Sequence, residues 1–364
     1  IRTRALPQAD GSYAISGTKI WITGGEHDLA DNIIHLVLAK LPDAPDSVKG
    51  ISLFLVPKFL EDGSRNPAFC GGLEHKMGIK ASATCVMNFE GAKGWLIGEP
   101  NKGLKCMFTM MNSARLMVGM QGLGIAESAY QISLGFAKER LQSRSLSGPK
   151  AADKPADPIL VHPDVRRMLL RQKVMIEGCR ALAYFTGMHL DVAHDHEDPQ
   201  VRQQSDDLVQ LLTPVVKAFL TDEGHNCSND GLQVLGGSGF TEDWGIEQLV
   251  RDCRITRIYE GTNGIQALDL VGRKLALGGG RAVRSYFALV EGWLKANADA
   301  PHAAAAGKAL KQLQQATMWI ATEGMKDPEQ AGAASVPYLR LFALTTLAWF
   351  WSRMALTAQH KLAE

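Results

Sequence analysis

The chain has 364 residues, of which 46% are hydrophobic and 21% charged, a composition typical of a folded globular protein rather than a disordered or fibrous one. Its length favours two or three structural units. Lys and Arg total 39 against 38 Asp and Glu, and this balance argues against a broad nucleic-acid or membrane-binding surface. Six dispersed cysteines without a CxxC pair predict neither a disulfide scaffold nor a zinc module, and they favour a reducing, cytoplasmic location.

No membrane span is predicted, because the most apolar stretch, 339–350, is interrupted by Arg340. The chain begins at Ile1 without an initiator Met and almost directly within a strand pattern. We therefore expect that an N-terminal part of the protein precedes it.

The first hundred residues are rich in β-branched and aromatic side chains with Gly and Asp between them. Short strands without long helices between them predict an antiparallel β-sandwich or barrel domain over 1–100. The predicted strands are 13–23, 33–39, 51–57 and 84–89.

Beyond residue 100, apolar residues recur at three- and four-residue spacing and predict a four-helix-bundle domain over 101–280. Its helices are predicted at 103–139, 163–194, 201–235, 246–253 and 263–277. Three glycines at 278–280 form a break, and a weaker break is expected at 296–307. An additional helical extension over 281–364, with helices at 308–323 and 335–360, completes an α+β multidomain fold.

Two groups of glycines predict different structural roles. Gly119, Gly122 and Gly124 lie inside the long predicted helix with no strand before them, so they favour close helix packing rather than a dinucleotide fingerprint. The Gly236–Gly239 turn follows a helix, and its unobstructed backbone with Gln233 suits a cofactor's phosphate or adenine edge. A plain helix C-cap remains the alternative.

Two further motifs are less specific. The 194–198 run of His, Asp and Glu has no recurring metal-ligand spacing, so we predict a solvated loop at a helix end and no metal. Trp21, Ile22 and Thr23 end the first strong strand before a glycine turn, and they offer a flat indole and a hydroxyl. That Trp could equally cap the core of the sheet.

The 258–266 segment, IYEGTNGIQ, is the sharpest feature of the sequence. Glu260 lies at a turn before an apolar helix, Thr262 is placed to cap that helix, and Gly261 permits an unusual backbone angle. A carboxylate at such a rigid junction suits general-base catalysis. An ordinary acidic residue at a helix N-terminus is an equally good interpretation.

Together these motifs resemble the acyl-CoA dehydrogenase family over 11–277, most of the chain. The resemblance rests on their order: GTKIWITGG, KMGIKASAT, LIGEPNKGL, MMNSARLMVGMQGLG, FAKERLQSR, LQVLGGSGFTED and VRDCRITRIYEGTNGIQ. The GEHD string, the loop at 145–158 and the C-terminal helices look most like the longer bacterial branch, which includes 3-methylthiopropanoyl-CoA dehydrogenases.

The resemblance implies an N-terminal helical domain, a middle β-domain and a C-terminal four-helix bundle, of which the last two are evident here. It implies FAD bound between the last two and shared with a neighbouring subunit of a homodimer or homotetramer. Trp21, Ile22 and Thr23 would contact the flavin, and Thr262 would lie near the pyrophosphate. The adenine half of a partner's FAD would be reached by Arg140, Gln142, Gln233 and Gly237.

By the same resemblance, Glu260 is the base that removes the α-proton of an acyl-CoA thioester as hydride passes from the β-carbon to the flavin, leaving a trans-2-enoyl-CoA. Electrons would then pass to an electron-transfer flavoprotein. Substrate-binding positions are Tyr259 and Gly261 beside the base, and Arg115 with Asn112 on the side of the CoA nucleotide. Many members carry Gln two residues after the Thr of this string, where this chain has Gly264.

Two other functions stay open. The chain could resemble the alkylation-response branch of the same superfamily, a flavin-binding, DNA-associated stress protein. Nine Lys and Arg against six Asp and Glu over 281–364 argue against that, because DNA affinity needs clustered positive charge. It could also be a folded but inactive fragment that does not retain FAD.

Overall fold

The computed structural model describes residues 1–363 and divides the chain into two compact units, Ile1–Ser113 and the part from Ala114 onward. We call them the β unit and the helical unit, and we describe each by itself. The dividing point lies inside one long helix, α1 (Gly103–Glu139). The domain boundaries near residues 100 and 280 stay predictions.

The β unit is a six-stranded sheet in the order β2-β1-β3-β4-β6-β5, closed into a barrel by an additional pairing of β2 with β6. This confirms the predicted sandwich or barrel class. The pairs are antiparallel except for a single parallel match of β1 with β3 at Arg4 and Lys40. The strands are β1 (Arg4–Pro7), β2 (Tyr13–Thr23), β3 (Ile34–Lys40), β4 (Ile51–Pro57), β5 (Ala68–Leu73) and β6 (Thr84–Ile97).

Alternating side chains fill the barrel. Val37 and Ala39 of β3 point inward between more exposed neighbours, as do Cys85, Met87 and Phe89 of β6. Strands β1 and β5 were not predicted, and β6 extends eight residues beyond its predicted end. β1 is only four residues long and ends in Pro, and β5 carries two glycines at an irregular register, so neither shows a clean strand pattern.

In the helical unit, most helices begin and end close to where the apolar periodicity predicts. Their bounds are α2 (Pro163–Asp195), α3 (Pro199–Leu235), α4 (Gly237–Phe240), α5 (Ile246–Arg254), α6 (Asn263–Asp269), α7 (Arg281–Ala296), α8 (Ala303–Thr322) and α9 (Pro328–Ala363). The predicted 263–277 helix is only partly α-helical, because it continues as a π-helix over Leu270–Lys274.

The C-terminal part differs from the prediction at two points. Helix α7 was not predicted, because it starts from a glycine without a side-chain cap and so gives no start signal. The expected break at 296–307 ends earlier than predicted, because α8 already begins in the alanine run at Ala303, where helix propensity is high.

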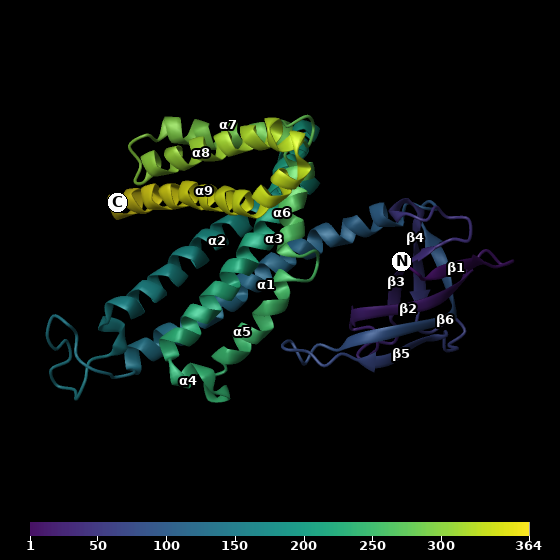
Figure 1. Cartoon of the computed structure of the whole chain (residues 1–364), viewed down its shortest axis with the longest axis horizontal. Coiled ribbons are helices and arrows are strands. Elements are labelled where there is room, and N and C mark those ends of the chain that lie inside the picture. The colour runs from purple at the N-terminus through teal and green to yellow at the C-terminus, as the bar shows by residue number, and fades with distance from the viewer. Residues whose placement is uncertain (364) are drawn as a thin grey trace. The chain divides into compact units, whose positions relative to one another are not determined.

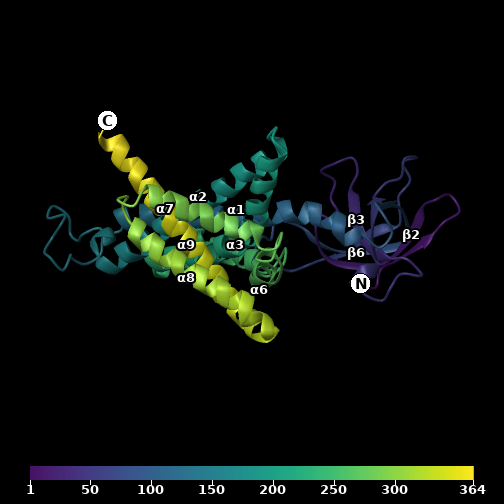
Figure 2. The same cartoon turned by 90° about the horizontal axis from the view of Figure 1, so that it is seen from above.

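One hydrophobic core holds the helical unit together. It contains Leu211 and Phe219 of α3 together with Tyr286 of α7 and Phe342 of α9. Figures 1 and 2 show α7 and α8 side by side, with α9 packed next to them and toward α2 and α3. The residues from 281 onward therefore share a core with the helices before them.

Among the described residues, α9 is the one helix long and apolar enough to cross a membrane by length and composition. More than half of its most apolar window is buried inside the protein. That burial is typical of a core helix, in line with its place in the shared core.

Close approach of α1 to α3 explains two of the three helix glycines. A Cβ at Gly119 would lie 2.8 Å from Val216, and one at Gly122 would lie 2.8 Å from the carbonyl oxygen of Leu220. In return, a Cβ at Gly224 of α3 would lie 2.5 Å from the carbonyl oxygen of Gly122. The packing interpretation is confirmed at Gly119 and Gly122, whereas Gly124 faces open space.

Candidate active site

The segment around Glu260 is a tightly held junction in the helical unit. Glu260 has φ +55°, in the left-handed region that non-glycine residues rarely adopt, and Gly261 follows with φ +83°. The hydroxyl of Thr262 caps α6 by accepting a hydrogen bond from the backbone N–H of Ile265. The predicted cap and the predicted unusual glycine angle are both confirmed.

Gln266, on the first turn of α6, ties the junction to that helix. Its amide nitrogen donates to the carbonyl oxygens of Glu260 at 3.2 Å and Gly261 at 3.3 Å. The side chain is fully buried, and its Oε1 atom has no hydrogen-bond partner among the described residues. A Cβ at Gly261 would lie 2.7 Å from the Gln266 amide nitrogen, so this position requires glycine for space as well as for its φ.

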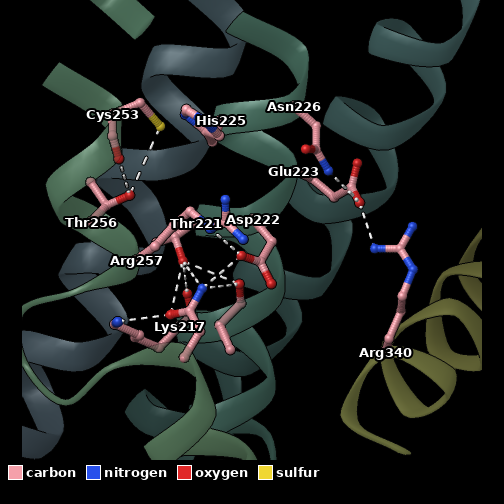
Figure 3. Close-up of polar contacts among 12 residues, drawn as sticks. Lys217, Thr221, Asp222, Glu223, His225, Asn226, Cys253, Thr256, Arg257 and Arg340 are labelled. Atoms are coloured by element: carbon pink, nitrogen blue, oxygen red, sulfur yellow. Dashed lines mark hydrogen bonds and ion pairs between the residues drawn. The ribbon is translucent and has the colours of Figure 1, made fainter. Parts of the chain in front are cut away.

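Lys217 of α3 also contacts this junction, although it was not predicted as a site residue. Its ammonium donates to the carbonyl oxygen of Gly261 and to the side-chain oxygen of Asn263, both at 2.9 Å. Figure 3 shows it among the neighbouring polar side chains of Thr221, Asp222 and Arg257. Burial lowers the pKa of Lys217 from 10.5 to about 8, while the negative charges of Asp222 and Glu260 act in the opposite direction.

Arg115 of α1 lies in the interior beside the same junction. It is 5% exposed, its Nη1 is 3.5 Å from a carboxylate oxygen of Asp269, and its Nη2 is 3.9 Å from where a Cβ of Gly261 would lie. Asn112, three residues earlier on α1, is exposed. The predicted role of these two residues toward the CoA nucleotide stays a prediction.

Tyr259 links the junction to α1. Its hydroxyl donates a hydrogen bond to the side-chain oxygen of Gln121. Burial raises the pKa of Tyr259 above its ordinary value, so the phenol is neutral and able to donate at physiological pH. α1, α3 and α6 therefore all hold residues 259–263.

A second group of predicted residues gathers at the far end of α1. Phe136 and Ala137 of α1 and Val234 and Leu235 of α3 share one apolar cluster, which brings the C-terminal ends of the two helices together. Exposed side chains and an exposed glycine surround it: Arg140, Gln142, Gln233 and Gly237. At 1.5 Å per residue, this group lies about 37 Å from Arg115 along α1.

The glycine turn there is a helix end with an open backbone. Gly236 has φ +59° and forms the C-cap of α3, with its N–H bonded to the carbonyl oxygen of Gln233. Positions that a Cβ would occupy at Gly236 and Gly237 have no neighbouring atom within 4 Å. The C-cap alternative is correct as local structure, and it leaves the backbone accessible to a ligand.

In the β unit, the end of β2 presents Trp21 to solvent. The register between β2 and β6 is irregular between Lys19 and Ile22, and Trp21 within it has φ +61° and is 71% exposed. Ile22 packs against the barrel core, and Thr23 is exposed. Trp21 therefore does not cap the sheet's core, which was the alternative interpretation.

Comparison with known proteins bears on both units. Residues 101–275 match the model described as acyl-CoA dehydrogenase, C-terminal domain, and residues 286–364 match the one described as acetyl-CoA dehydrogenase C-terminal like. The chain is 47% identical to 3-methylmercaptopropionyl-CoA dehydrogenase of Ruegeria pomeroyi, over 100% of this chain and 63% of that protein. It is 36% identical to a broad-specificity linear acyl-CoA dehydrogenase of Mycobacterium tuberculosis, over 98% of this chain and 62% of that protein.

One of the solved structures that are similar to this chain is also an acyl-CoA dehydrogenase. The acyl-CoA dehydrogenase of Bacillus anthracis complexed with FAD superposes with a TM-score of 0.74 at 25% identity, covering 97% of this chain and 58% of that one. The chain thus spans less than two thirds of the length of the relatives it matches. The two family models together cover more than two thirds of the chain, and the first of them includes the motifs of the resemblance that lie beyond residue 101. This chain belongs to the acyl-CoA dehydrogenase family.

Proposed function

We propose that this chain forms the flavin- and base-bearing part of an FAD-dependent acyl-CoA dehydrogenase, with Glu260 as the general base. The observation that carries the proposal is the junction at Glu260. A glutamate in the left-handed region, followed by a glycine that has no room for a Cβ, is a strained arrangement that the surroundings must maintain. Such strain is typical of functional sites, where it fixes the direction of a reactive group.

The exposed residues fit the parts of FAD, which is the cofactor of this family. The solvent-exposed indole of Trp21 offers a flat apolar surface for the flavin ring, and Thr23, two residues further on, is also exposed and offers a hydroxyl. Thr262 accepts a hydrogen bond from Ile265, and its own hydroxyl proton is available for a phosphate oxygen. When bound, FAD supplies the acceptor for the hydride that leaves the substrate β-carbon.

The chain's own residues then account for proton removal. The Glu260 carboxylate takes the α-proton of the thioester, so the electron pair of that C–H bond becomes part of the new double bond. The backbone N–H of Glu260 has no acceptor among the described residues, so it can donate to the thioester oxygen and stabilise the developing negative charge. Tyr259 and Gly261 would line the space beside the acyl group.

We also propose a second subunit and an electron acceptor as partners of this chain. The exposed Arg140, Gln142, Gln233 and Gly237 lie about 37 Å from Arg115 along α1, a separation that supports their serving the FAD of a second subunit in a homodimer or homotetramer. We propose an electron-transfer flavoprotein as the electron acceptor. A cytoplasmic location is supported by the six cysteines, all of which are free thiols.

The DNA-associated alternative is not favoured, because relatives at 47% and 36% identity are named as dehydrogenases. The inactive-fragment alternative is tested together with the main proposal. The FAD-loaded protein is mixed anaerobically with 3-methylmercaptopropionyl-CoA and with short, medium and long straight-chain acyl-CoAs, and the flavin absorbance is followed. We expect bleaching with at least one of them.

Glu260→Gln is the decisive variant, because glutamine keeps the shape of glutamate and cannot accept the α-proton. We expect it to retain FAD and lose bleaching. Glu242→Gln, at an exposed acid of the same unit, is the matched control and should bleach at the wild-type rate. Bleaching of Glu260→Gln at the wild-type rate would refute the assignment of the base.

A further inference from the structure

We propose that Lys217 is a positioning residue for the carboxylate of Glu260, acting through the backbone of Gly261 and the side chain of Asn263. The inference rests on the proposed function, because it concerns the same junction. Lys217 stands within an apolar stretch of α3, LLTPVVKAFL, and it is fully buried.

Lys217 is unusual because its charge is not neutralised by a contacting acid. Among the described residues, its ammonium bonds to two neutral oxygens, the carbonyl of Gly261 and the amide of Asn263. Burying a charge without a paired counterion is costly, and an apolar side chain of the same length would fill this position without that cost. The lysine is therefore better explained by what it holds than by packing.

What Lys217 holds is the chain on either side of the α6 cap. Gly261 and Asn263 flank Thr262, so one ammonium fixes both neighbours of the capping residue. Asn263 is bound to α3 a second time, since its amide nitrogen donates to Asp222 at 2.9 Å, Thr221 at 3.0 Å and the Ala218 carbonyl at 3.1 Å. The start of α6 is thereby fastened to residues 217–222 of α3, part of which is visible in Figure 3.

Fastening Gly261 fixes the direction of Glu260. The Gly261 carbonyl receives the ammonium at 2.9 Å and the Gln266 amide at 3.3 Å, and the Glu260 carbonyl receives the same amide at 3.2 Å. Two consecutive carbonyls are thus held from two helices, α3 and α6. Without the ammonium, the Gly261 carbonyl loses its bond to α3, and the left-handed backbone at the neighbouring Glu260 can relax toward ordinary angles even though Asn263 keeps its own bonds to α3. The carboxylate would then point away from its reactive position.

The first test needs neither flavin nor activity. Lys217→Met has nearly the same length and no donor, and Arg340→Met is its control, since Arg340 also bonds α3, through Glu223 at 2.9 Å, but from α9. Amide hydrogen exchange is measured by mass spectrometry on peptides that contain Ile265 and Gln266, whose N–H groups bond to Thr262. We expect exchange at least about tenfold faster in Lys217→Met and unchanged in Arg340→Met. Wild-type exchange in a folded Lys217→Met would overturn the proposal.

The second test uses the FAD-loaded protein and the acyl-CoA that bleaches the wild type best. A misdirected base should lower kcat by about tenfold or more while KM stays within about threefold, because the base contributes to proton removal and not to binding. Lys217→Arg, which keeps a cationic donor, should recover part of kcat, and an α-deuterated substrate should show a larger isotope effect in Lys217→Met than in the wild type. An unchanged kcat in Lys217→Met would contradict positioning. Failure of the wild type to bleach would count against the proposed function alone, because the hydrogen-exchange test needs neither flavin nor activity.

Discussion

Replacing Lys217 by Met should change how the stability of the helical unit depends on pH. In the folded protein, burial lowers the lysine pKa from 10.5 to about 8. Between these values the unfolded chain binds a proton that the folded protein does not, so the free energy of unfolding rises with pH. For one group titrating at about 8 when folded and 10.5 when unfolded, the rise from pH 7 to pH 9 is about 1.3 kcal/mol.

The assay is urea unfolding followed by helical circular dichroism at pH 7, 8 and 9. Buried thiols such as Cys227, whose pKa burial raises to about 12, lower stability over the same range, but they do so equally in both proteins. The difference between wild type and Lys217→Met isolates the lysine. It should shift in favour of the wild type by about 1.3 kcal/mol from pH 7 to pH 9. A difference in the free energy of unfolding that stays constant from pH 7 to pH 9 would refute the argument that the buried ammonium loses its proton near pH 8. The difference between wild type and the Arg340→Met control should stay constant over this range.

Two further predictions concern packing and cofactor binding. Gly122→Ala should lower the free energy of unfolding, measured in urea, by about 1 to 3 kcal/mol, because its Cβ would lie 2.8 Å from the Leu220 carbonyl oxygen. Gly124→Ala is the control and should be neutral or stabilising, because Gly124 faces open space. Equal effects of the two substitutions would contradict the close crossing of α1 and α3. Trp21→Ala should weaken FAD binding by about tenfold in a fluorescence titration without changing the melting temperature, because the indole is 71% exposed. An unchanged affinity would separate Trp21 from the flavin site.

The sequence predicted most of the fold because periodicity and caps are local signals. The long helix over 103–139 and the Thr262 cap follow from neighbouring residues alone, and both are confirmed. The strand β5 was missed because its irregular, glycine-containing pattern becomes a strand only when paired with β6. The start of α8 was misplaced for a different reason, since an alanine run beside Asn, Asp and Pro gives conflicting signals.

The candidate site was predicted only where its residues are close in sequence. Glu260, Gly261 and Thr262 form one string, and their local geometry could be anticipated from the residue types. Lys217 lies more than forty residues away, and its contact with Gly261 depends on how α3 packs against the junction. A single lysine inside an apolar helical stretch is the signal that could have identified it, because such a residue needs a buried partner.

The close crossing of α1 and α3 limits how far the two helices that hold this site can shift along each other. With glycines in contact at the crossing, neither helix can slide along the other without one backbone striking the next side chain. Arg115 and Lys217 reach the Gly261 segment from these two helices. Slippage by one residue would displace one helix by about 1.5 Å, enough to break a hydrogen bond of 2.9 Å. The glycines at this crossing therefore fix the register of α1 against α3. The position of the Glu260 carboxylate thus depends on a helix contact that touches neither substrate nor cofactor.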